Sequence, residues 1–214
     1  MFVTSHRSIE FTMVCGHKET ASVDVRGTQQ MAEERRNLAT MLCSTCVRTL
    51  ENWLKADHGQ QAFPMDFPVL DGISAAQVKY ATDVRLKEFK KYGPIMQALS
   101  KDSSELAKFA WRALYMCFMV TNSRYWLDER KRFDHHVWGG EIKRLMKAPG
   151  FSDRVSSSSA YGSFHNSRNR DSISYFMAIN PACDLQGKNL PLMRFWTKEM
   201  FKPTLALEED RQAS

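Results

Sequence analysis

Two closely spaced pairs of metal-binding residue types constrain this fold more than any other feature. Residues 15–17 read Cys-Gly-His, and residues 43–46 read Cys-Ser-Thr-Cys. Three thiols and one imidazole suit a tetrahedral zinc ion, although the single residue between the first pair is fewer than the usual spacing of about two to four. His6 and His58 are alternative ligands. We expect one structural Zn²⁺ with these ligands: Cys15, His17, Cys43 and Cys46.

The residues around both pairs predict a small hairpin packed on helices. Residues 9–14 alternate apolar and polar side chains, which is typical of a strand, and residues 20–26 predict the returning strand. Residues 29–42 are rich in helix formers, and residues 47–56 predict a second helix. A hairpin and helix bury little surface, so we expect residues 1–56 to form a zinc-ribbon-like module stabilised largely by its metal.

The middle of the chain predicts a linker and then a helical domain over residues 73–150. Residues 57–72 contain two prolines and two glycines and predict a linker along the surface of the body, since Phe63, Phe67 and Leu70 are too apolar for a free tether. Capping boxes at Ser74/Gln77 and Asp102/Glu105 open two helices. We expect helices at 74–92 (ending before Gly93-Pro94), 106–120, 124–132 and 138–147.

The C-terminal part is less regular in its pattern. Residues 151–171 are rich in Ser and Arg and predict a flexible loop. Residues 172–214 predict a segment packed on the helical domain, with a β-like run at 173–179 and a short helix at 192–201. The predicted fold class is therefore α+β, mostly α.

The composition argues against a membrane-spanning protein and against a secreted protein held by disulfides. No apolar run in the 214 residues approaches the ~18 that a membrane span requires. Five cysteines in a metal-type pattern indicate a reducing compartment and not a disulfide framework. We therefore expect a cytoplasmic protein that does not enter a membrane.

The positive charge is concentrated in the C-terminal half. The formal net charge is +6, and such an excess favours nucleic acid or an acidic protein surface, although it is also common on a solvated face. Trp138 and Tyr161 either stack on bases or belong to the core. The candidate nucleic-acid or partner-binding residues are Arg130, Lys131, Arg132, Lys143, Arg144, Lys147, Arg168 and Arg170.

The residue pattern predicts no reaction. Asp134-His135-His136 could bind a hydrolytic metal but has no second ligand cluster beside it in the sequence. Residues 156–159 are serines without a nucleophile motif to pair with His165. Cys117 lies in the most apolar predicted helix, where a thiol is usually inert. We expect a protein that is not an enzyme.

Three segments resemble a family of uncharacterised proteins common in phages and other bacterial mobile elements. Residues 11–26 with Cys43-x-x-Cys46 are similar to its strand, Cys-Gly-His, strand, Gly, helix, Cys-x-x-Cys layout. Residues 70–85 resemble its Gly-Ser-x-Lys-Gln-x-x-Trp-Ala-x-x-Ile-Arg signature, and residues 123–130 its Ala-Lys-x-Trp-Ile-x-x-Arg signature. The chain departs from the pattern by an inserted Ile73, by Ala76 in place of Lys and by Tyr80 in place of Trp.

This resemblance implies an architecture and a biological context. It covers residues 9–132 and leaves residues 133–214 to carry this member's own function. We expect a non-enzymatic interaction protein of a phage or plasmid that binds a host protein or nucleoprotein complex, and so counters host defence. The alternative is direct binding of DNA or RNA through the basic C-terminal half.

Overall fold

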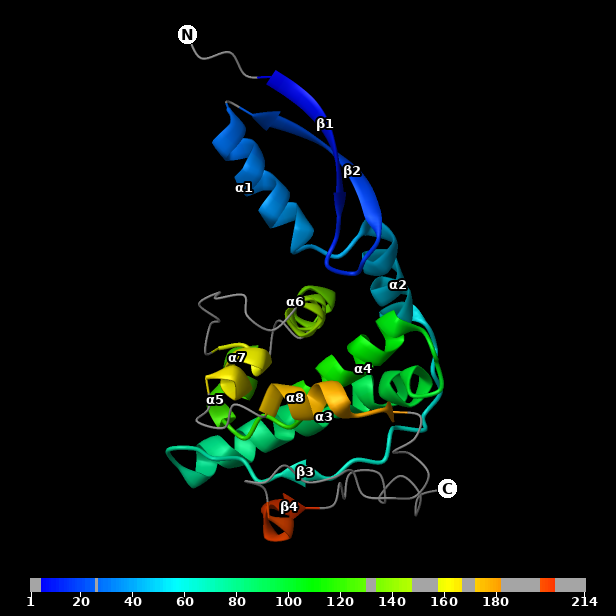
Figure 1. Ribbon diagram of the computed structural model, residues 1–214. Coiled ribbons are helices and arrows are strands. Elements are labelled where there is room, and N and C mark those ends of the chain that lie inside the picture. Colours follow the sequence, from blue (N-terminus) through cyan, green and yellow to red (C-terminus); the bar gives the residue numbers. More distant parts are fainter. Residues whose placement is uncertain are drawn as a thin grey trace.

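The fold is α+β and mostly helical, as the sequence predicts. The computed structural model describes residues 5–25, 27–129, 134–147, 158–166, 172–181 and 197–202. A two-stranded hairpin stands at one end of the molecule, and a helical body forms the rest (Figure 1). The elements are β1 (Ser5–Thr12), β2 (Lys18–Val25), α1 (Thr28–Ala39), α2 (Ser44–Lys55), β3 (Phe67–Pro68), α3 (Ala75–Leu99), α4 (Glu105–Phe118), α5 (Ser123–Glu129), α6 (His135–Met146), α7 (Ala160–His165), α8 (Ser172–Ala178), a 3₁₀ turn (Lys198–Met200) and β4 (Phe201–Lys202).

The hairpin has one face on α1 and one face in solvent. β1 and β2 pair antiparallel, and their alternation places Ile9 and Phe11 on the face that packs, with Ile9 buried. The other face is polar and exposed, as at Ser8 and Ser22, which lie opposite each other. The predicted hairpin is therefore confirmed, with β1 beginning earlier, at Ser5.

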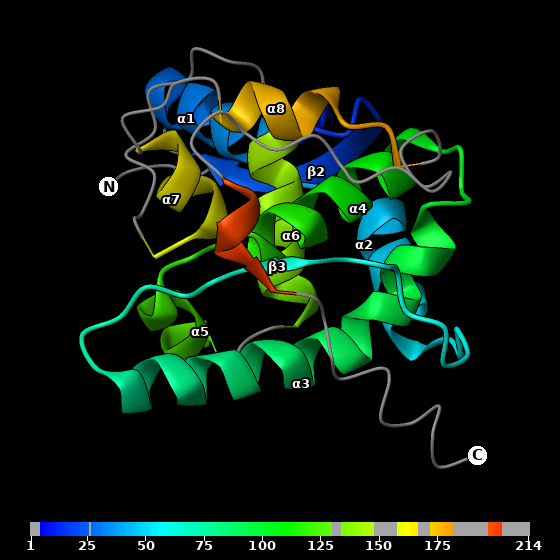
Figure 2. The same cartoon turned by 90° about the horizontal axis from the view of Figure 1, so that it is seen from below.

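The body is built around α4, which contacts α3, α6, α7 and α8. Figure 2 shows α3 running along one side of this body, with α8 on the opposite side. Trp111 of α4 is fully buried and stacks on Tyr115, with ring centroids 5.0 Å apart. The predicted central helix is confirmed, but Ser104 caps it, not Asp102: the Ser104 hydroxyl accepts from the Ala107 N–H at 3.2 Å.

Helix α3 continues through Gly93 and Pro94, where the sequence predicts its end. The residue before a proline usually leaves the helical region because its Cβ meets the proline ring, and glycine lacks that atom. Gly93 also lets a neighbouring segment approach: a Cβ there would lie 2.7 Å from the Ala62 Cβ, and its carbonyl accepts from the Phe63 N–H at 3.0 Å. The turns beyond the proline are held by buried side chains: Ile95, Met96 and Leu99.

Residues 57–72 contribute to the core and do not lie along the surface as predicted. Phe63 packs edge-on against Trp111, with ring centroids 5.1 Å apart, and Phe67 does the same against Phe89 at 4.8 Å. β3 within this segment pairs with β4 near the other end of the chain. Aromatic side chains bury large apolar areas, which explains why an irregular segment is drawn into the core.

Two predictions for the C-terminal part are wrong. Residues 160–165, predicted as loop, form α7, and residues 173–179, predicted as a β-like run, lie mostly in α8. In α8 the buried positions are Ser172 and Phe176, followed by buried Ile179, which is helical spacing. The predicted helix at 192–201 is a 3₁₀ turn and then β4 over its described residues.

Two helical glycines give a matched test of this packing. Gly93→Ala should destabilise the protein by about 1–3 kcal/mol, because the rigid Ala62 Cβ leaves no room. Gly139→Ala in α6 should be neutral or stabilising by up to about 1 kcal/mol, since its Cβ would lie an ordinary 3.6 Å from Leu50 Cδ1 and alanine favours helix. Urea unfolding measures both. Equal effects of the two substitutions would contradict the packing described around Gly93.

Candidate metal centre

The four predicted metal ligands lie together at the base of the hairpin. Cys15 and His17 lie in the β1–β2 turn, and Cys43 and Cys46 lie at the start of α2. These segments meet where the turn approaches the connection between α1 and α2 (Figure 1), and the Val14 N–H donates to the Met41 carbonyl there at 3.1 Å. The four ligand atoms lie within 4.8 Å of one another. The sequence prediction of a clustered site is confirmed.

The ligand separations fit a tetrahedral metal ion. The His17 Nδ1 lies 3.3 Å from the Cys43 Sγ and 3.4 Å from the Cys46 Sγ. Zinc bond lengths of about 2.3 Å to sulfur and about 2.0–2.1 Å to nitrogen give a ligand-to-ligand distance of about 3.5 Å at the tetrahedral angle. The His17-to-sulfur distances fit such an ion directly, and the widest separation in the cluster, up to 4.8 Å, would need to shorten by about 1 Å to the ~3.8 Å between two zinc-bound sulfurs. The His17 Nδ1 faces two of the sulfurs, so the cluster is completed by His17 without His6 or His58.

Local backbone geometry explains how the turn presents its ligands. Gly16 adopts a φ of +78°, a left-handed conformation that favours glycine. The turn is closed by the Met13 N–H, which donates to the His17 carbonyl at 2.8 Å. The Cys43 N–H donates to the Cys15 Sγ at 3.4 Å, so the second ligand pair also orients the first.

The start of α2 is an electropositive position for thiolates. Cys43 is the N-cap residue of α2, and its sulfur accepts from the Cys46 N–H at 3.3 Å. Unpaired N–H groups and the helix dipole stabilise negative charge at such a position. Glu19 of β2 pairs with a further N–H at this helix start, that of Ser44. Its carboxylate accepts from both the N–H and the hydroxyl of Ser44 at 2.7 Å. These hydrogen bonds, the hydroxyl first, lower the pKa of Glu19.

The thiols differ in how readily they ionise. Burial raises the pKa of Cys15, but the Cys43 N–H and contacts with His17 outweigh burial and bring it to about 7. Burial, together with the neighbouring Cys43 and Cys15 thiols, strongly raises the pKa of Cys46. A divalent cation would offset the unfavourable burial and mutual repulsion of the thiolates, because each thiolate would then face positive charge. The cluster is thus suited to a metal, which would stabilise the three thiolates together.

The site joins the hairpin to the body. Cys43 and Cys46 are buried and belong to the same hydrophobic core as Leu50 of α2. α2 packs on α6, where Trp53 and Trp138 have ring centroids 6.1 Å apart. α1, in contrast, has no buried residue. Ligands from the hairpin turn and from a core helix therefore surround one point, and a metal ion there would connect the two parts.

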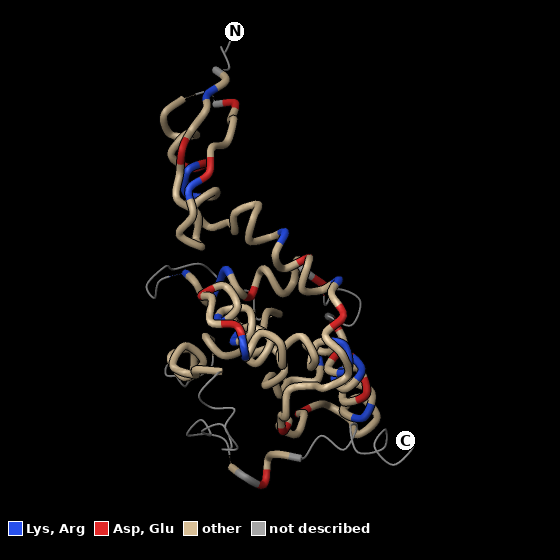
Figure 3. Tube along the Cα trace, turned by 90° about the vertical axis from the view of Figure 1, so that its right-hand side faces the viewer, with Lys and Arg blue, Asp and Glu red and all other residues tan. Residues whose placement is uncertain are grey.

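Three of the predicted basic residues lie in the described part of the chain, and Lys143 and Arg144 among them contact other residues of the protein. Lys143, Arg144 and Lys147 are each partly buried. The Lys143 ammonium lies 3.7 Å from the Met41 sulfur, and burial, then the nearby Arg144, lowers its pKa. Figure 3 shows acidic and basic residues interspersed along the hairpin and the body. The remaining candidates lie outside the described residues: Arg130, Lys131, Arg132, Arg168 and Arg170.

The aromatic residues considered for base stacking face inward or toward neighbours. Trp138 is fully buried and donates to the Ala110 carbonyl at 2.9 Å, so the base-stacking interpretation is wrong and the core interpretation is confirmed. Tyr161 is half-buried and stacks on His165, with ring centroids 5.4 Å apart. Trp138 therefore offers no face to a nucleic acid, and one face of the Tyr161 ring is taken by His165.

The other residues considered for a chemical role are helix caps or core residues. Asp134 caps α6, where its carboxylate accepts from the His136 N–H at 2.9 Å and the Val137 N–H at 3.2 Å. Ser159 caps α7, where its hydroxyl accepts from the Gly162 N–H at 2.9 Å. Cys117 is fully buried in α4. Within the described residues, the Cys/His cluster is the group placed to hold a metal ion.

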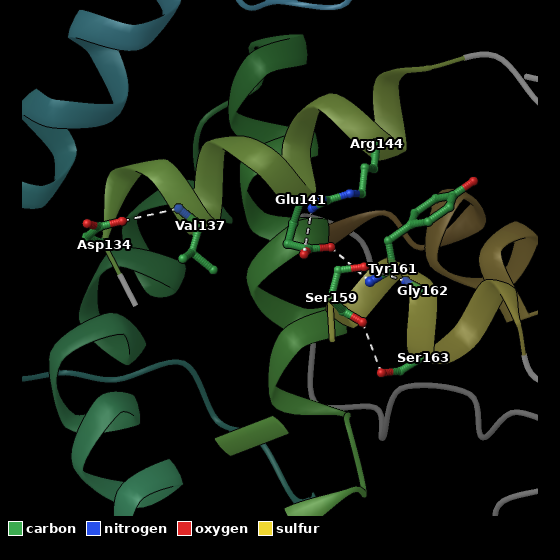
Figure 4. Close-up of polar contacts among 8 residues, drawn as sticks. All are labelled: Asp134, Val137, Glu141, Arg144, Ser159, Tyr161, Gly162 and Ser163. Carbon is green, nitrogen blue, oxygen red and sulfur yellow. Dashed lines mark hydrogen bonds and ion pairs between the residues drawn. The ribbon is translucent and has the colours of Figure 1, made fainter. Parts of the chain in front are cut away.

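Sequence reasoning missed a buried carboxylate, Glu141, which is only 2% exposed. Figure 4 shows it between α6 and α7, accepting from Arg144 at 2.9 Å and from the Tyr161 N–H at 2.8 Å. Both oxygens are therefore engaged, and the carboxylate anchors the start of α7. Glu141 could not be predicted as a buried carboxylate because the sequence pattern of residues 160–165 indicated a loop. Without α7, no partner for Glu141 could be foreseen.

Comparisons with protein-family models, with curated proteins and with solved structures find no match to this chain. No helix in the described residues is both long and apolar enough to cross a membrane.

His17 and His58 provide a test of the ligand set. His17→Ala should weaken metal affinity by more than about 10–100-fold, because even an outer hydrogen-bond partner of a ligand contributes that much. His58→Ala should leave affinity unchanged, since His58 contacts the Trp53 carbonyl at 2.7 Å and not the cluster. Competition with a chromophoric chelator measures both. Equal losses of metal affinity in the two variants would show that His17 is not a ligand.

Proposed function

We propose that this chain is a non-enzymatic interaction protein whose N-terminal module is fixed by a structural zinc ion and whose exposed surface binds a protein partner. The closure of Cys15, His17, Cys43 and Cys46 around one point carries the proposal. Four protein ligands complete a tetrahedral shell and leave no position for substrate or for an activated water. A metal held in this way supplies structure and not catalysis.

Zinc is the ion that this donor set favours. Thiolate and imidazole are soft or borderline ligands, whereas magnesium and calcium select oxygen ligands. The N–H groups that point at the Cys15 and Cys43 sulfurs stabilise thiolate charge, as outer hydrogen-bond partners do in metal sites.

The start of α3 supplies the partner-binding surface in this proposal. Ile73 is 97% exposed and Tyr80 is 51% exposed, and both are large apolar side chains. Ile73 immediately precedes Ser74, the N-cap residue of α3, and the exposed Ala76 and Tyr80 lie about one turn apart on the helix, so these residues lie around the first turns of α3. Tyrosine is among the residues most enriched at the energetic centres of interfaces. Tyr80 also occupies the Trp position of the signature that the chain resembles.

The resemblance to mobile-element proteins supports a host protein or nucleoprotein as the partner. Direct nucleic-acid binding is the second candidate, favoured by the net charge of +6. It has less support, because Lys143 and Arg144 make contacts within the protein and Trp138 is buried.

Two cysteine variants test the metal. Purified protein should contain one zinc per chain, and Cys15→Ser should lose it, because a serine hydroxyl is a poor substitute for a thiolate ligand. Cys117→Ala should retain the metal, since Cys117 is buried in α4 away from the cluster. Elemental analysis of the purified full-length chains gives the result. Absence of zinc from the wild type after purification and reconstitution would end the zinc proposal.

A second experiment tests the partner. Ile73→Ser with Tyr80→Ala should reduce capture of a specific bacterial protein by about tenfold or more, since removing an anchor residue costs upward of ~2 kcal/mol. Lys90→Ala, on the exposed side of the same helix, is the control and should have little effect. Mobility-shift titration runs in parallel. Retardation of DNA or RNA with a steep salt dependence, and no protein partner, would favour the second candidate.

A further inference from the structure

The exposed face of the hairpin carries a serine, a histidine and an aspartate in one hydrogen-bonded row. The Ser22 Oγ lies 2.6 Å from the His6 Nε2, and the His6 Nδ1 lies 2.6 Å from the Asp24 Oδ1. His6 and Asp24 are directly opposite in the β1–β2 register, and Ser22 is two residues from Asp24 on the same face. The row thus links the two strands on the side away from α1.

With Asp24 ionised and His6 neutral, the two hydrogen bonds define where the protons lie. An ionised carboxylate only accepts hydrogen bonds, so the His6 Nδ1 must carry the proton directed at Asp24. In the neutral imidazole the Nε2 then has a lone pair, and the Ser22 hydroxyl must donate to it. This is the arrangement in which a histidine acts as general base toward a serine and a carboxylate orients the histidine.

We propose that Ser22 is a nucleophile, activated by His6 and oriented through Asp24, that accepts acyl groups from activated esters. The Ser22 oxygen bonds to the ester carbonyl carbon while its proton moves to the His6 Nε2. The bond from that carbon to the leaving oxygen then breaks, and the leaving oxygen takes the proton from His6.

The exposure of the Ser22–His6–Asp24 row limits how far it can accelerate acylation of Ser22. The side chains of His6 and Asp24 are 71% and 66% exposed, so an ester reaches Ser22 directly from solvent. General-base assistance contributes roughly 10²–10⁴-fold, and full enzymatic rates also need preorganised stabilisation of the oxyanion. The expected reaction is therefore the selective acylation of Ser22, a single modification of the chain and not a catalytic cycle. Asp24 acts through His6 and is a positioning residue.

Ser8 provides a matched control within the same hairpin. It lies directly opposite Ser22, is also exposed, and is not part of the hydrogen-bonded row. Full-length protein is treated with p-nitrophenyl acetate, and peptide mass spectrometry follows acetylation of each residue with time. Ser22 should be acetylated at least about 100-fold faster than Ser8. His6→Asn should reduce Ser22 to the rate of Ser8, and Asp24→Asn should give an intermediate rate.

Zinc content and circular dichroism of each variant show whether the hairpin is intact, so a folding defect is distinguished from lost reactivity. Ser8→Ala should leave Ser22 acetylation unchanged. Equal rates at Ser8 and Ser22 in the wild type, or acetyl groups on His6 and the cysteines with Ser22 unmodified, would overturn the proposal. The result is independent of partner binding through α3.

Discussion

The position of Cys43 and Cys46 on the first turn of α2 is the constraint on which the architecture depends. These residues belong to the hydrophobic core, and their sulfurs also face the hairpin turn that carries Cys15 and His17. α1 buries no residue, so the apolar contact of the hairpin with the body is made by the turn and by the connection to α2, where Met13 and Leu42 belong to the core. The Glu19–Ser44 hydrogen bonds add to this connection, and a metal ion bound at the cluster would strengthen it further.

Local chemistry explains what the sequence predicts well. The metal cluster follows from ligand type and spacing, and Ser74 was recognisable as a helix cap; its hydroxyl accepts from the Gln77 N–H at 3.2 Å. These features involve residues close in the chain or a ligand chemistry with few alternatives. The same holds for α4, whose apolar pattern on nearly every side indicates a central helix.

The failures come from contacts between distant segments. α3 continues past Pro94 because Gly93 has no Cβ to meet the proline ring and because the later turns are buried, and the approach of Ala62 and Phe63 to Gly93 is not visible in the local sequence. The run at 173–179 has apolar residues compatible with either period, and its packing on α4 and α7 selects the helix. Glu141 and the Ser22–His6–Asp24 row are likewise invisible in sequence, the latter because its members are 16 and 18 residues apart.

Because α2 both carries two residues of the Cys/His cluster and packs in the core, a metal ion bound at the cluster would stabilise more than the hairpin. A ligand that binds only the folded state adds RT ln(1 + [L]/Kd) to stability, about 2.7 kcal/mol when free metal is 100 times Kd. Because Cys46 and Leu50 lie in one continuous core, that increment acts on the body and not only on the hairpin. If zinc is the ion that the cluster holds, the folded population of the entire chain would follow the free zinc concentration of its surroundings, and the abundance of the protein would report metal status.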